Sequence, residues 1–441
     1  MAVPSNDLQN VQTYQKAELA WLLNSFALIG STNKKFKDFN SLTANLGDTV
    51  TFDLPPRYTT YNGLQVTLQP SVQRVQNLVA SQAFNTSSAY TDQQFIFNVR
   101  DYMERFGEAA MKELGSAIEA DISKNITSSV VINDPQNSNY GQKQTNSGPY
   151  RFFYSGLTNA TLSPINSYTQ LAQAIANFED FGASNNKLRG VLPLVDVPAI
   201  IGSGLTQFAT NRNNDIATSW MIGEFANCNW MKSNLLPIHY AGTVGNTSGS
   251  NVLTLVSTND PSGKAVTQIT FSGATANDPN AIKSGDMFEF NDGVSGQPNL
   301  RFLTFIGHQP CSQKVQFRAN NDAAADGSGN VVVNITPQLT WVQNENQNLD
   351  HALAAGMQVT VMPSHRAGLI DSGDQFYLAM PQLPDQAPYS TVSTVDKDSG
   401  ASIRHYFGSQ GFGLNSRAYV RDVIFGSTLV PDNSMRVLFP L

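Results

Sequence analysis

The sequence predicts an α+β protein in which a β-barrel domain is inserted into an α/β body. Three observations support this fold class. A long helical pattern occupies residues 91–126, short alternating apolar runs fill residues 239–339, and helix and strand patterns alternate on both sides of that segment. The chain has 441 residues and a hydrophobic share of 41%, which is enough for two or three domains with cores of their own.

Residues 1–43 are expected to form an N-terminal arm with one short helix, AELAWLLNSFALI, over residues 17–29. One helical stripe of this segment is formed by Leu19, Leu22, Leu23 and Phe26. The chain has no run of 18 apolar residues, and its first residues lack the basic and apolar regions of a secretory signal. Neither a membrane span nor a signal peptide is therefore expected.

Residues 44–81 are expected to form a long β-excursion. Apolar and polar residues alternate over residues 50–54, Asn62-Gly63 is a hairpin-turn signal, and a return strand is expected to start with Val66 and Leu68. The segment has few apolar residues for a core, and an isolated two-stranded hairpin is marginally stable in water. It is therefore expected to lie on something else, such as another subunit.

The stretch TDQQFIFNVRDYMERFGEAAMKELGSAIEADISKNI, from Thr91 to Ile126, predicts one helix about 50 Å long. Its first four residues fit a capping box, and its apolar residues recur at spacings of three and four. Gly107 and Gly115 each weaken such a helix by roughly 1 kcal/mol relative to Ala. The narrow apolar stripe favours packing on one sheet, and no heptad is sustained for the alternative of a coiled coil. The residues expected to make this packing are Met103, Phe106, Leu114 and Ile122.

The remaining segments predict the rest of the body. A helix over residues 168–181, the strand RGVLPLVD and the helix VPAIIGSGLTQF indicate an α/β subdomain. Runs such as NVLTLV, TQITF and VVVNITP, separated by Asn-, Asp- and Gly-rich turns, indicate a β-barrel or sandwich over residues 239–339. An α/β texture resumes after residue 340, and GASIRHYF and RAYVRDVIFGSTLV predict long strands of a terminal sheet.

No catalytic or cofactor motif is found. Ser203 in IGSGL lacks the preceding Gly of a GxSxG elbow, and no GxxxxGK[ST] or GxGxxG occurs. NNDAAADGSGN favours a β-turn at Asp326-Gly327 over a calcium loop, and Asp396 and Asp398 favour a solvated turn over an acid/base pair. We therefore expect no catalytic, cofactor-binding or metal-binding residue and no enzyme activity, although a triad assembled from scattered residues has no linear signature.

Charge, cysteine and histidine usage likewise give no indication of a nucleic-acid or metal site. Charged residues make up 14% of the chain, net charge is −7, and the one basic cluster, Lys34, Lys35 and Lys37, favours a solvated turn over a nucleic-acid site. Cys228 and Cys311 form no CxxC pair, and the five histidines show no metal-ligand spacing. A polar, weakly charged surface suits packing against copies of the same chain. The alternative is an extracellular β-protein, because composition alone does not separate these two interpretations.

The order of the predicted segments resembles the major capsid (coat) proteins of tailed DNA phages with the Hong Kong 97 fold. Within that family, the inserted β-domain resembles the branch of the short-tailed phage P-22. Three stretches carry the resemblance, which spans nearly the whole chain. They are GDTVTFDLPPRY followed by the long helix, SGDMFEFNDGV followed by KVQFRANNDAAADGSGNVVVNITPQL, and DKDSGASIRHYF paired with YVRDVIFGSTLVPDNSMRVL.

The resemblance implies a role for each segment. The excursion is implied to be an extended loop over a neighbouring subunit. The long "spine" helix and the terminal sheet would form a peripheral domain, and the α/β body would be an axial domain at five- and six-fold axes. The insertion would contact adjacent capsomers. The implied segments are an arm (1–43), extended loop (44–81), peripheral domain with spine helix (82–150), first half of the axial domain (151–238), inserted β-barrel (239–339), second half of the axial domain (340–390) and peripheral terminal strands (391–441).

The resemblance also implies partners and a location. The chain would assemble with itself, as hexamers and pentamers of an icosahedral shell, and with a scaffolding protein and a portal complex. It would enclose double-stranded DNA without sequence-specific binding, in a virion capsid assembled in the host cytoplasm. At the loop tip, Arg57, Tyr58 and Tyr61 are expected assembly contacts, because Arg and Tyr are favoured at interfaces. The alternative is a β-rich tail protein or adhesin, although no fibre repeats are present.

Overall fold

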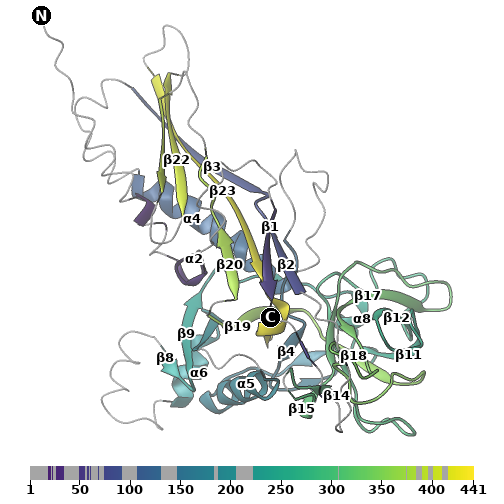
Figure 1. The fold of residues 1–441 in the computed structure, drawn as a ribbon. Helices are drawn as coiled ribbons and strands as arrows, with labels where there is room; N and C mark the ends of the chain where they lie inside the picture. The colour runs from purple at the N-terminus through teal and green to yellow at the C-terminus, as the bar shows by residue number, and fades with distance from the viewer. Residues whose placement is uncertain are drawn as a thin grey trace, which may run out of the picture.

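The computed structural model has three regions: a central sheet, an elongated sheet and a barrel (Figure 1). It is an α+β structure with a closed six-stranded barrel. The structure describes residues 18–20, 22, 26–33, 49–54, 57–58, 60, 68, 74–91, 107–130, 147–182, 187–204, 222–305, 307–373, 375–383, 390–395, 401–409 and 416–441. No helix within these ranges combines the length and apolar character needed to cross a membrane.

The central sheet has seven strands in the order β4-β24-β19-β7-β9-β8, with β10 paired to β19. Its strands are β4 (Arg151–Phe153), β24 (Ser434–Phe439), β19 (His365–Ser372), β7 (Leu188–Pro193), β9 (Cys228–Ser233), β8 (Gly223–Phe225) and β10 (Ile238–His239). Strand pairs β24-β4 and β7-β9 are parallel, and the other pairs are antiparallel. The sheet is therefore mixed, as is common in large sheets with helices on their faces.

Helices cover both faces of the central sheet. Leu188 and Leu192 of β7 share a core with α5 (Tyr168–Asp180) and α6 (Val197–Gly204), whereas Val191 between them joins a second core on the opposite face. This alternation follows from the two-residue period of a strand. The predicted helix at residues 168–181 is confirmed, and Ser167 caps it by accepting a hydrogen bond from Gln170 N at 3.3 Å.

The elongated sheet has five strands in the order β20-β23-β22-β21, with β3 paired to β23. Its strands are β20 (Phe376–Ala379), β23 (Ser416–Leu429), β22 (Ser402–Ser409), β21 (Ser390–Val395) and β3 (Gln82–Thr91). Figure 1 shows α4 (Glu108–Ser123) lying along this sheet, and Leu114 and Ile122 are buried in one core with Ile403 and Val423. The apolar stripe of α4 therefore packs on the strands predicted at the C-terminal end of the chain.

The assignment of strands to the two sheets corrects the predicted segments. Strand β24, expected among the terminal strands of residues 391–441, lies in the central sheet, and β20, from the segment 340–390, lies in the elongated sheet. All six residues of β24 are buried. A strand buried on both faces belongs inside a doubly covered sheet, and the central sheet provides that cover.

The long helix is described only over its C-terminal half. Thr91, the expected N-cap, is the last residue of β3, and residues 92–106, with Met103 and Phe106, lie outside the described residues. After α4 the chain continues as a 3-10 turn, η3 (Lys124–Thr127), and Ser128 ends it in the left-handed conformation with φ of 56°. The predicted end at Ile126 therefore falls inside a tightened last turn.

The arm helix is interrupted, which corrects the single helix expected over residues 17–29. Phe26 is extended, with φ −126° and ψ 139°, and a second short helix, α2 (Ala27–Ser31), starts after it. Leu19 and Leu22 are buried, and Leu23 lies outside the described residues. The break follows from tertiary packing, because a Cβ on Gly115 of α4 would lie 2.2 Å from the Phe26 ring. Gly115 thus lets the arm lie directly against the helix.

The extended loop begins with a two-stranded ribbon, β1 (Thr49–Leu54) and β2 (Arg74–Val79). Its register pairs Thr49 with Val79 and Leu54 with Arg74, so the return strand lies later than the expected start at Val66 and Leu68. Leu68 is outside any strand and 90% exposed, while Asn62-Gly63 lies outside the described residues. Strand β2 is fixed at this place because Gln76 Nε2 donates to Thr428 Oγ1 of β23 at 2.9 Å.

The barrel closes in the order β11-β12-β17-β16-β13-β18. Its strands are β11 (Val252–Thr258), β12 (Val266–Ser272), β17 (Asn330–Leu339), β16 (Gln316–Ala319), β13 (Met287–Phe290) and β18 (Gln358–Val361). Strand β18 pairs with both β11 and β13, so the predicted domain end at residue 339 is too early. The sequence pattern could not show this, because four residues, QVTV, separated from the other strands complete the ring.

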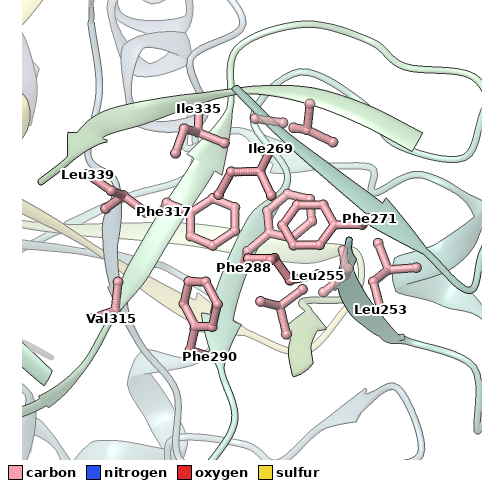
Figure 2. Packing of buried hydrophobic residues seen from close by; sticks show 14 of the residues in the cluster. Leu253, Leu255, Ile269, Phe271, Phe288, Phe290, Val315, Phe317, Ile335 and Leu339 are labelled. Carbon is pink, nitrogen blue, oxygen red and sulfur yellow. The ribbon is translucent and has the colours of Figure 1, made fainter. Parts of the chain in front are cut away.

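Side chains fill the barrel (Figure 2). Phe271, Phe288 and Phe317 stack with nearly parallel rings, the last two with centroids 4.8 Å apart. A barrel this small holds a packed core, because inward side chains occupy its interior. The remaining elements are β14 (Arg301–Leu303) paired with β15 (Pro310–Lys314), β5 (Leu157–Thr158) paired with β6 (Thr161–Leu162), α8 (Thr243–Asn246) and η4 (Pro431–Asn433).

Candidate functional site: the junction of loop, body and barrel

The base of the extended loop is bound to the body by one carboxylate. Asp432 lies in η4, between β23 and β24, and its Oδ2 accepts hydrogen bonds from Arg57 Nη2 at 2.9 Å and from Arg74 Nη2. Its Oδ1 accepts from Tyr150 Oη at 3.1 Å. Arg57 follows β1 and Arg74 begins β2, so Asp432 holds both sides of the β1–β2 connection at one point.

Burial and charge act in opposite directions on this carboxylate. Burial would raise the pKa of Asp432, but the two arginines and the hydrogen bonds from Arg74 and Tyr150 outweigh it, and the pKa is lowered. Burial lowers the pKa of Arg57, which Asp432 only partly offsets. Asp432 is therefore ionised in the folded chain and accepts hydrogen bonds from two guanidinium groups.

Aromatic rings extend this junction to the inserted domain. The guanidinium of Arg57 lies 4.1 Å from the ring centroid of Phe305, which follows β14. The fully buried Arg151 of β4 lies 4.1 Å from the ring of Phe181 and donates to the main-chain oxygen of Asp432 at 3.2 Å. Phe181 also packs on Phe305, with ring centroids 4.6 Å apart. Loop, central sheet and insertion thus meet in one cluster.

A second junction binds the barrel to the central sheet through Arg436 of β24. Its Nε donates to Ile126 O in η3 at 2.9 Å, and its Nη1 donates to Gly285 O, just before β13, at 3.0 Å. The side chain is fully buried, and burial together with Arg318 lowers its pKa to about 9. One side chain thus joins the end of the long helix, the central sheet and the barrel.

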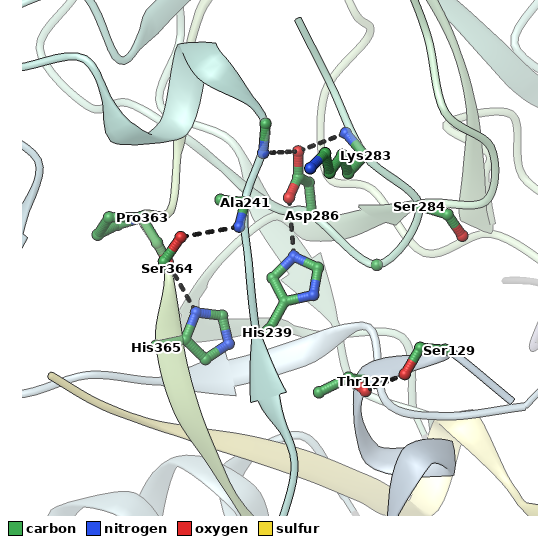
Figure 3. A network of polar contacts seen from close by, with 12 residues as sticks. Thr127, Ser129, His239, Ala241, Lys283, Ser284, Asp286, Pro363, Ser364 and His365 are labelled. Carbon is green, nitrogen blue, oxygen red and sulfur yellow. Dashed lines mark hydrogen bonds and ion pairs between the residues drawn. The ribbon is translucent and has the colours of Figure 1, made fainter. Parts of the chain in front are cut away.

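Histidine and carboxylate complete this second junction (Figure 3). Asp286 accepts from Gly242 N at 3.1 Å and from Lys283 N at 2.8 Å, and it lies 2.8 Å from His239 Nε2. His365 Nδ1 donates to Pro363 O at 2.7 Å, and burial, His239 and Arg436 hold the pKa of His365 well below its ordinary value. His365 is therefore neutral at neutral pH and serves as packing in this region.

The arm is bound to the elongated sheet by a third polar cluster. Glu18 accepts from Arg421 Nη2 at 2.8 Å and from Tyr419 Oη at 3.1 Å, and all three side chains are buried. His405 Nε2 lies 3.5 Å from Glu18, but burial and Arg421 lower the pKa of His405 to about 3, so this contact is not an ion pair at neutral pH. The Glu18–Arg421 pair carries the electrostatic attraction here.

The helix α2 of the arm is capped by another helix. Glu119 of α4 accepts from Leu28 N at 3.0 Å and from Ile29 N at 3.3 Å, and Ser233 donates to it at 3.1 Å. Burial raises the pKa of Glu119 although these bonds oppose the shift. Arg189, paired with Asp371, also donates to Ser31 O of α2 at 2.5 Å. The arm is thus fastened to both sheets.

The predicted site residues fall in different places. Arg57 lies in the Asp432 cluster of its own chain, Tyr58 is 59% exposed, and Tyr61, Met103 and Phe106 lie outside the described residues. Leu114 and Ile122 are buried. Arg57, expected at the loop tip, instead lies at the loop base. There Arg57 and Arg74 both bind Asp432, which corrects the expectation that the loop has little to hold it on its own subunit.

The buried charged residues were not predicted from the sequence. Arg151, Arg318, Arg421 and Arg436 are fully buried and all lie in strands. The available signal was the low charge content of 14%: an arginine retained inside an apolar run such as SMRVLF is a candidate for a buried contact. Asp326 is a turn residue, as predicted, and accepts from Ser328 N and Asn330 N.

Within the described ranges, no group of three or more His, Cys, Asp or Glu side chains is placed to hold a metal ion. Both cysteines are free and buried, and burial raises the pKa of Cys228 and of Cys311. The polar clusters described above join segments of chain to one another. Their geometry is that of structural junctions.

No protein-family profile matches the chain, and no curated protein matches it. The chain is similar in structure to phage capsid proteins. The capsid of Ralstonia phage GP4 is 8% identical and has a TM-score of 0.42, with 91% of this chain and 86% of that chain covered. The capsid of cyanophage P-SCSP1u is 10% identical with a TM-score of 0.38, over 90% of this chain and 84% of that chain.

The acid-stable capsid of Helicobacter pylori bacteriophage KHP30 is 8% identical with a TM-score of 0.36, and the similarity covers 100% of this chain and 99% of that chain. TM-scores below 0.5 describe a distant likeness. The functional assignment therefore depends on the chain's own elements.

Proposed function

We propose that the chain is the major capsid protein of a double-stranded DNA tailed phage and assembles into the icosahedral shell around the genome. Its fold would be the Hong Kong 97 type with an inserted barrel. The elongated sheet with α4 would be the peripheral domain, the central sheet the axial domain, and the β1–β2 ribbon the base of the extended loop. Scaffolding protein and portal complex would be partners, and assembly would take place in the host cytoplasm.

The observation that carries this proposal is the extended arrangement of the chain in three regions. Separate cores serve the barrel, the α5/α6 side of the central sheet and the elongated sheet, and Figure 1 shows these regions side by side. A subunit of this shape has a long perimeter for contacts with copies of itself.

Particle size tests the proposal. The full chain would be expressed with and without the product of the neighbouring scaffold gene and examined by electron microscopy and sedimentation velocity. Closed shells or open tubes of megadalton size are expected. A small, discrete oligomer under both conditions would contradict the proposal and favour the alternative, a β-rich tail protein or adhesin.

The loop tip is proposed as an assembly contact, and the structure changes how this is tested. Arg57→Ala would weaken the Asp432 cluster within the subunit, so a defect of that variant would not report on assembly alone. Tyr58 is 59% exposed, and truncating the two tyrosines removes neither Arg57 nor Asp432. Loss of an interface anchor costs about 1–2 kcal/mol or more, repeated at every subunit.

The double variant Tyr58→Ala/Tyr61→Ala is therefore expected to melt within about 1–2 °C of the parent chain, since Tyr58 is exposed and the proposal assigns Tyr61 to a contact with a neighbouring subunit. Its yield of closed particles should fall strongly. Tyr240→Ala serves as a matched control, because Tyr240 is 64% exposed but lies beside the central sheet. A normal shell yield from the double variant would show that the loop tip makes no assembly contact.

A further inference from the structure

A cavity of about 220 Å³ opens beside the Asp432 cluster, between the loop base, the body and the inserted domain. Its polar lining is formed mainly by Arg57, Arg74, Tyr150, His308, Gln347 and Asp432. The volume is several times the roughly 30 Å³ that one water molecule occupies in the liquid. A small solute with a few hydrogen-bonding atoms therefore fits.

The charges around the cavity do not balance. Among its described lining residues, Asp432 is the one carboxylate, against the two guanidinium groups of Arg57 and Arg74. Arg151 does not line the cavity but lies close by and donates to the main-chain oxygen of Asp432. The three arginines of this region therefore exceed its one aspartate by two positive charges, and the side chain of Arg74 is 29% exposed. An excess of buried positive charge costs free energy unless an anion compensates it.

Two polar atoms at the cavity have no hydrogen-bond partner among the described residues. They are Arg57 Nε and His308 Nδ1, and both are buried. A buried donor left without a partner costs about 1–3 kcal/mol. Partial burial and the proximity of Arg57 lower the pKa of His308, so its ring is neutral and can present a proton at Nδ1. Both groups line the same space.

We propose that this cavity is a binding site for a small divalent oxyanion of the size of inorganic phosphate. Arg57 Nε and His308 Nδ1 would donate to its oxygens, and Arg74 would supply charge at the mouth, where its side chain is 29% exposed. Guanidinium groups bind tetrahedral oxyanions through charge-assisted hydrogen bonds. The bound anion joins the loop base to the inserted domain, since Arg57 belongs to the first and His308 to the second.

The proposal does not depend on shell formation, and it is tested on the unassembled full chain. Isothermal titration with inorganic phosphate at constant ionic strength, set with sodium chloride, is expected to give saturable binding at one site. Thermal unfolding should shift upward with phosphate concentration, because a ligand that binds only the folded state stabilises it. An equal shift with sodium chloride alone would mean general ionic screening and would overturn the proposal.

Variants locate the site. Arg57→Gln is expected to weaken phosphate binding by about tenfold or more through loss of a charge-assisted donor. His308→Gly should weaken it by several-fold without touching the Asp432 ion pairs, and Gly adopts the positive φ of 48° at this position without strain. Arg301→Gln is the control, since Arg301 of β14 pairs with Asp292 and is not among the residues that line the cavity.

If Arg57→Gln fails to fold, His308→Gly and Arg301→Gln still decide the question. Unchanged phosphate affinity in His308→Gly, or an equal loss in Arg301→Gln, would overturn the site. Sulfate should compete with phosphate for it, whereas chloride at the same ionic strength should not. Particle formation is a separate measurement, so failure of this proposal leaves the shell function untouched.

Discussion

At the scale of single residues, several buried charged side chains lie where segments of chain meet. Asp432 binds two arginines of the extended loop, Arg436 bonds to the end of the long helix and to Gly285 before the first residue of β13, and Arg421 binds Glu18 of the arm. A buried ion pair adds little net stability over apolar packing, but removing one partner leaves the other charge uncompensated. These residues therefore select how the segments are joined.

The first prediction concerns Asp432. Asp432→Asn leaves Arg57 and Arg74 without their carboxylate and is expected to destabilise the chain by about 3–5 kcal/mol. Chemical denaturation measures this. Asp292→Asn, which breaks the more exposed pair with Arg301, should cost about 1 kcal/mol or less. Equal effects of the two substitutions would show that the Asp432 cluster is no stronger than a surface ion pair.

Asp432 also predicts a pH dependence. Its folded-state pKa is lowered, so its stabilising contribution is full above its unfolded pKa of about 3.9 and is lost as pH falls toward the folded value. The parent chain should therefore lose stability more steeply below about pH 4 than Asp432→Asn does. Denaturation midpoints of both proteins between about pH 3 and pH 7 measure this difference, and parallel profiles would contradict it.

At the scale of elements, α4 and the barrel are built on different principles. Helix α4 has one buried stripe and depends on the elongated sheet and the arm for its packing, with Gly115 allowing Phe26 to approach. The barrel has a closed ring of strands and a core formed mostly by side chains of the inserted domain, joined by Tyr150 and Phe181 of the body. An element with a core of its own can fold alone, whereas a helix with one apolar stripe needs a partner.

The second prediction follows from the burial of Leu114, which is 3% exposed. Leu114→Ala should destabilise the chain by about 2–5 kcal/mol, through lost apolar burial and the cavity left behind. Aggregation in place of shells is the expected outcome of expression. Glu113→Ala, at the exposed neighbouring position of the same helix, should change stability by less than about 0.5 kcal/mol. A parent-like melting temperature for Leu114→Ala would mean that the stripe is misassigned.

The third prediction concerns the barrel boundary. A fragment of residues 240–363 contains all six barrel strands and should be soluble and monomeric, with β-type circular dichroism and cooperative unfolding. A fragment of residues 240–339 lacks β18, which lies between β11 and β13, and should lose cooperative unfolding because two strand edges are left open. Identical melting curves for the two fragments would place the boundary at 339 after all.

At the scale of the whole molecule, the chain crosses between its three regions several times. Strand β3 belongs to the elongated sheet, and α4 packs along that sheet. The chain then forms most of the central sheet and the barrel. Near its C-terminal end, β23 pairs in the elongated sheet and β24 in the central sheet. The three polar junctions lie where these crossings meet. This construction gives an extended subunit whose regions are tied to one another at defined points, which suits a tile in a shell.

The fourth prediction concerns covalent joining of subunits. Some proteins of the Hong Kong 97 family, which this chain resembles, crosslink the extended loop to a neighbour through a Lys–Asn isopeptide bond. No lysine occurs between Gly47 and Ser81, and the loop arginines, Arg57 and Arg74, cannot form that bond. Denaturing gels of assembled particles should therefore show a single band near 47.9 kDa. A ladder of higher bands would contradict this.

Local signals in the sequence were sufficient for much of the fold. Helix α5, strand β7 and the barrel strands β11, β12 and β17 lie where periodicity placed them, because each has a regular apolar pattern bounded by turn residues. The α+β class and the inserted barrel follow from those elements. Leu114 and Ile122 were identifiable because helical spacing alone sets which side chains share a face.

Tertiary structure decided what no local pattern contains. Strand β24 joined the central sheet, β18 closed the barrel, and the arm helix broke at Phe26, each because of a partner distant in sequence. The same holds for Arg57, whose carboxylate, Asp432, lies 375 residues away. Periodicity reports which face of a segment is apolar, but pairing and charge compensation depend on which segments meet, and only the folded chain determines that.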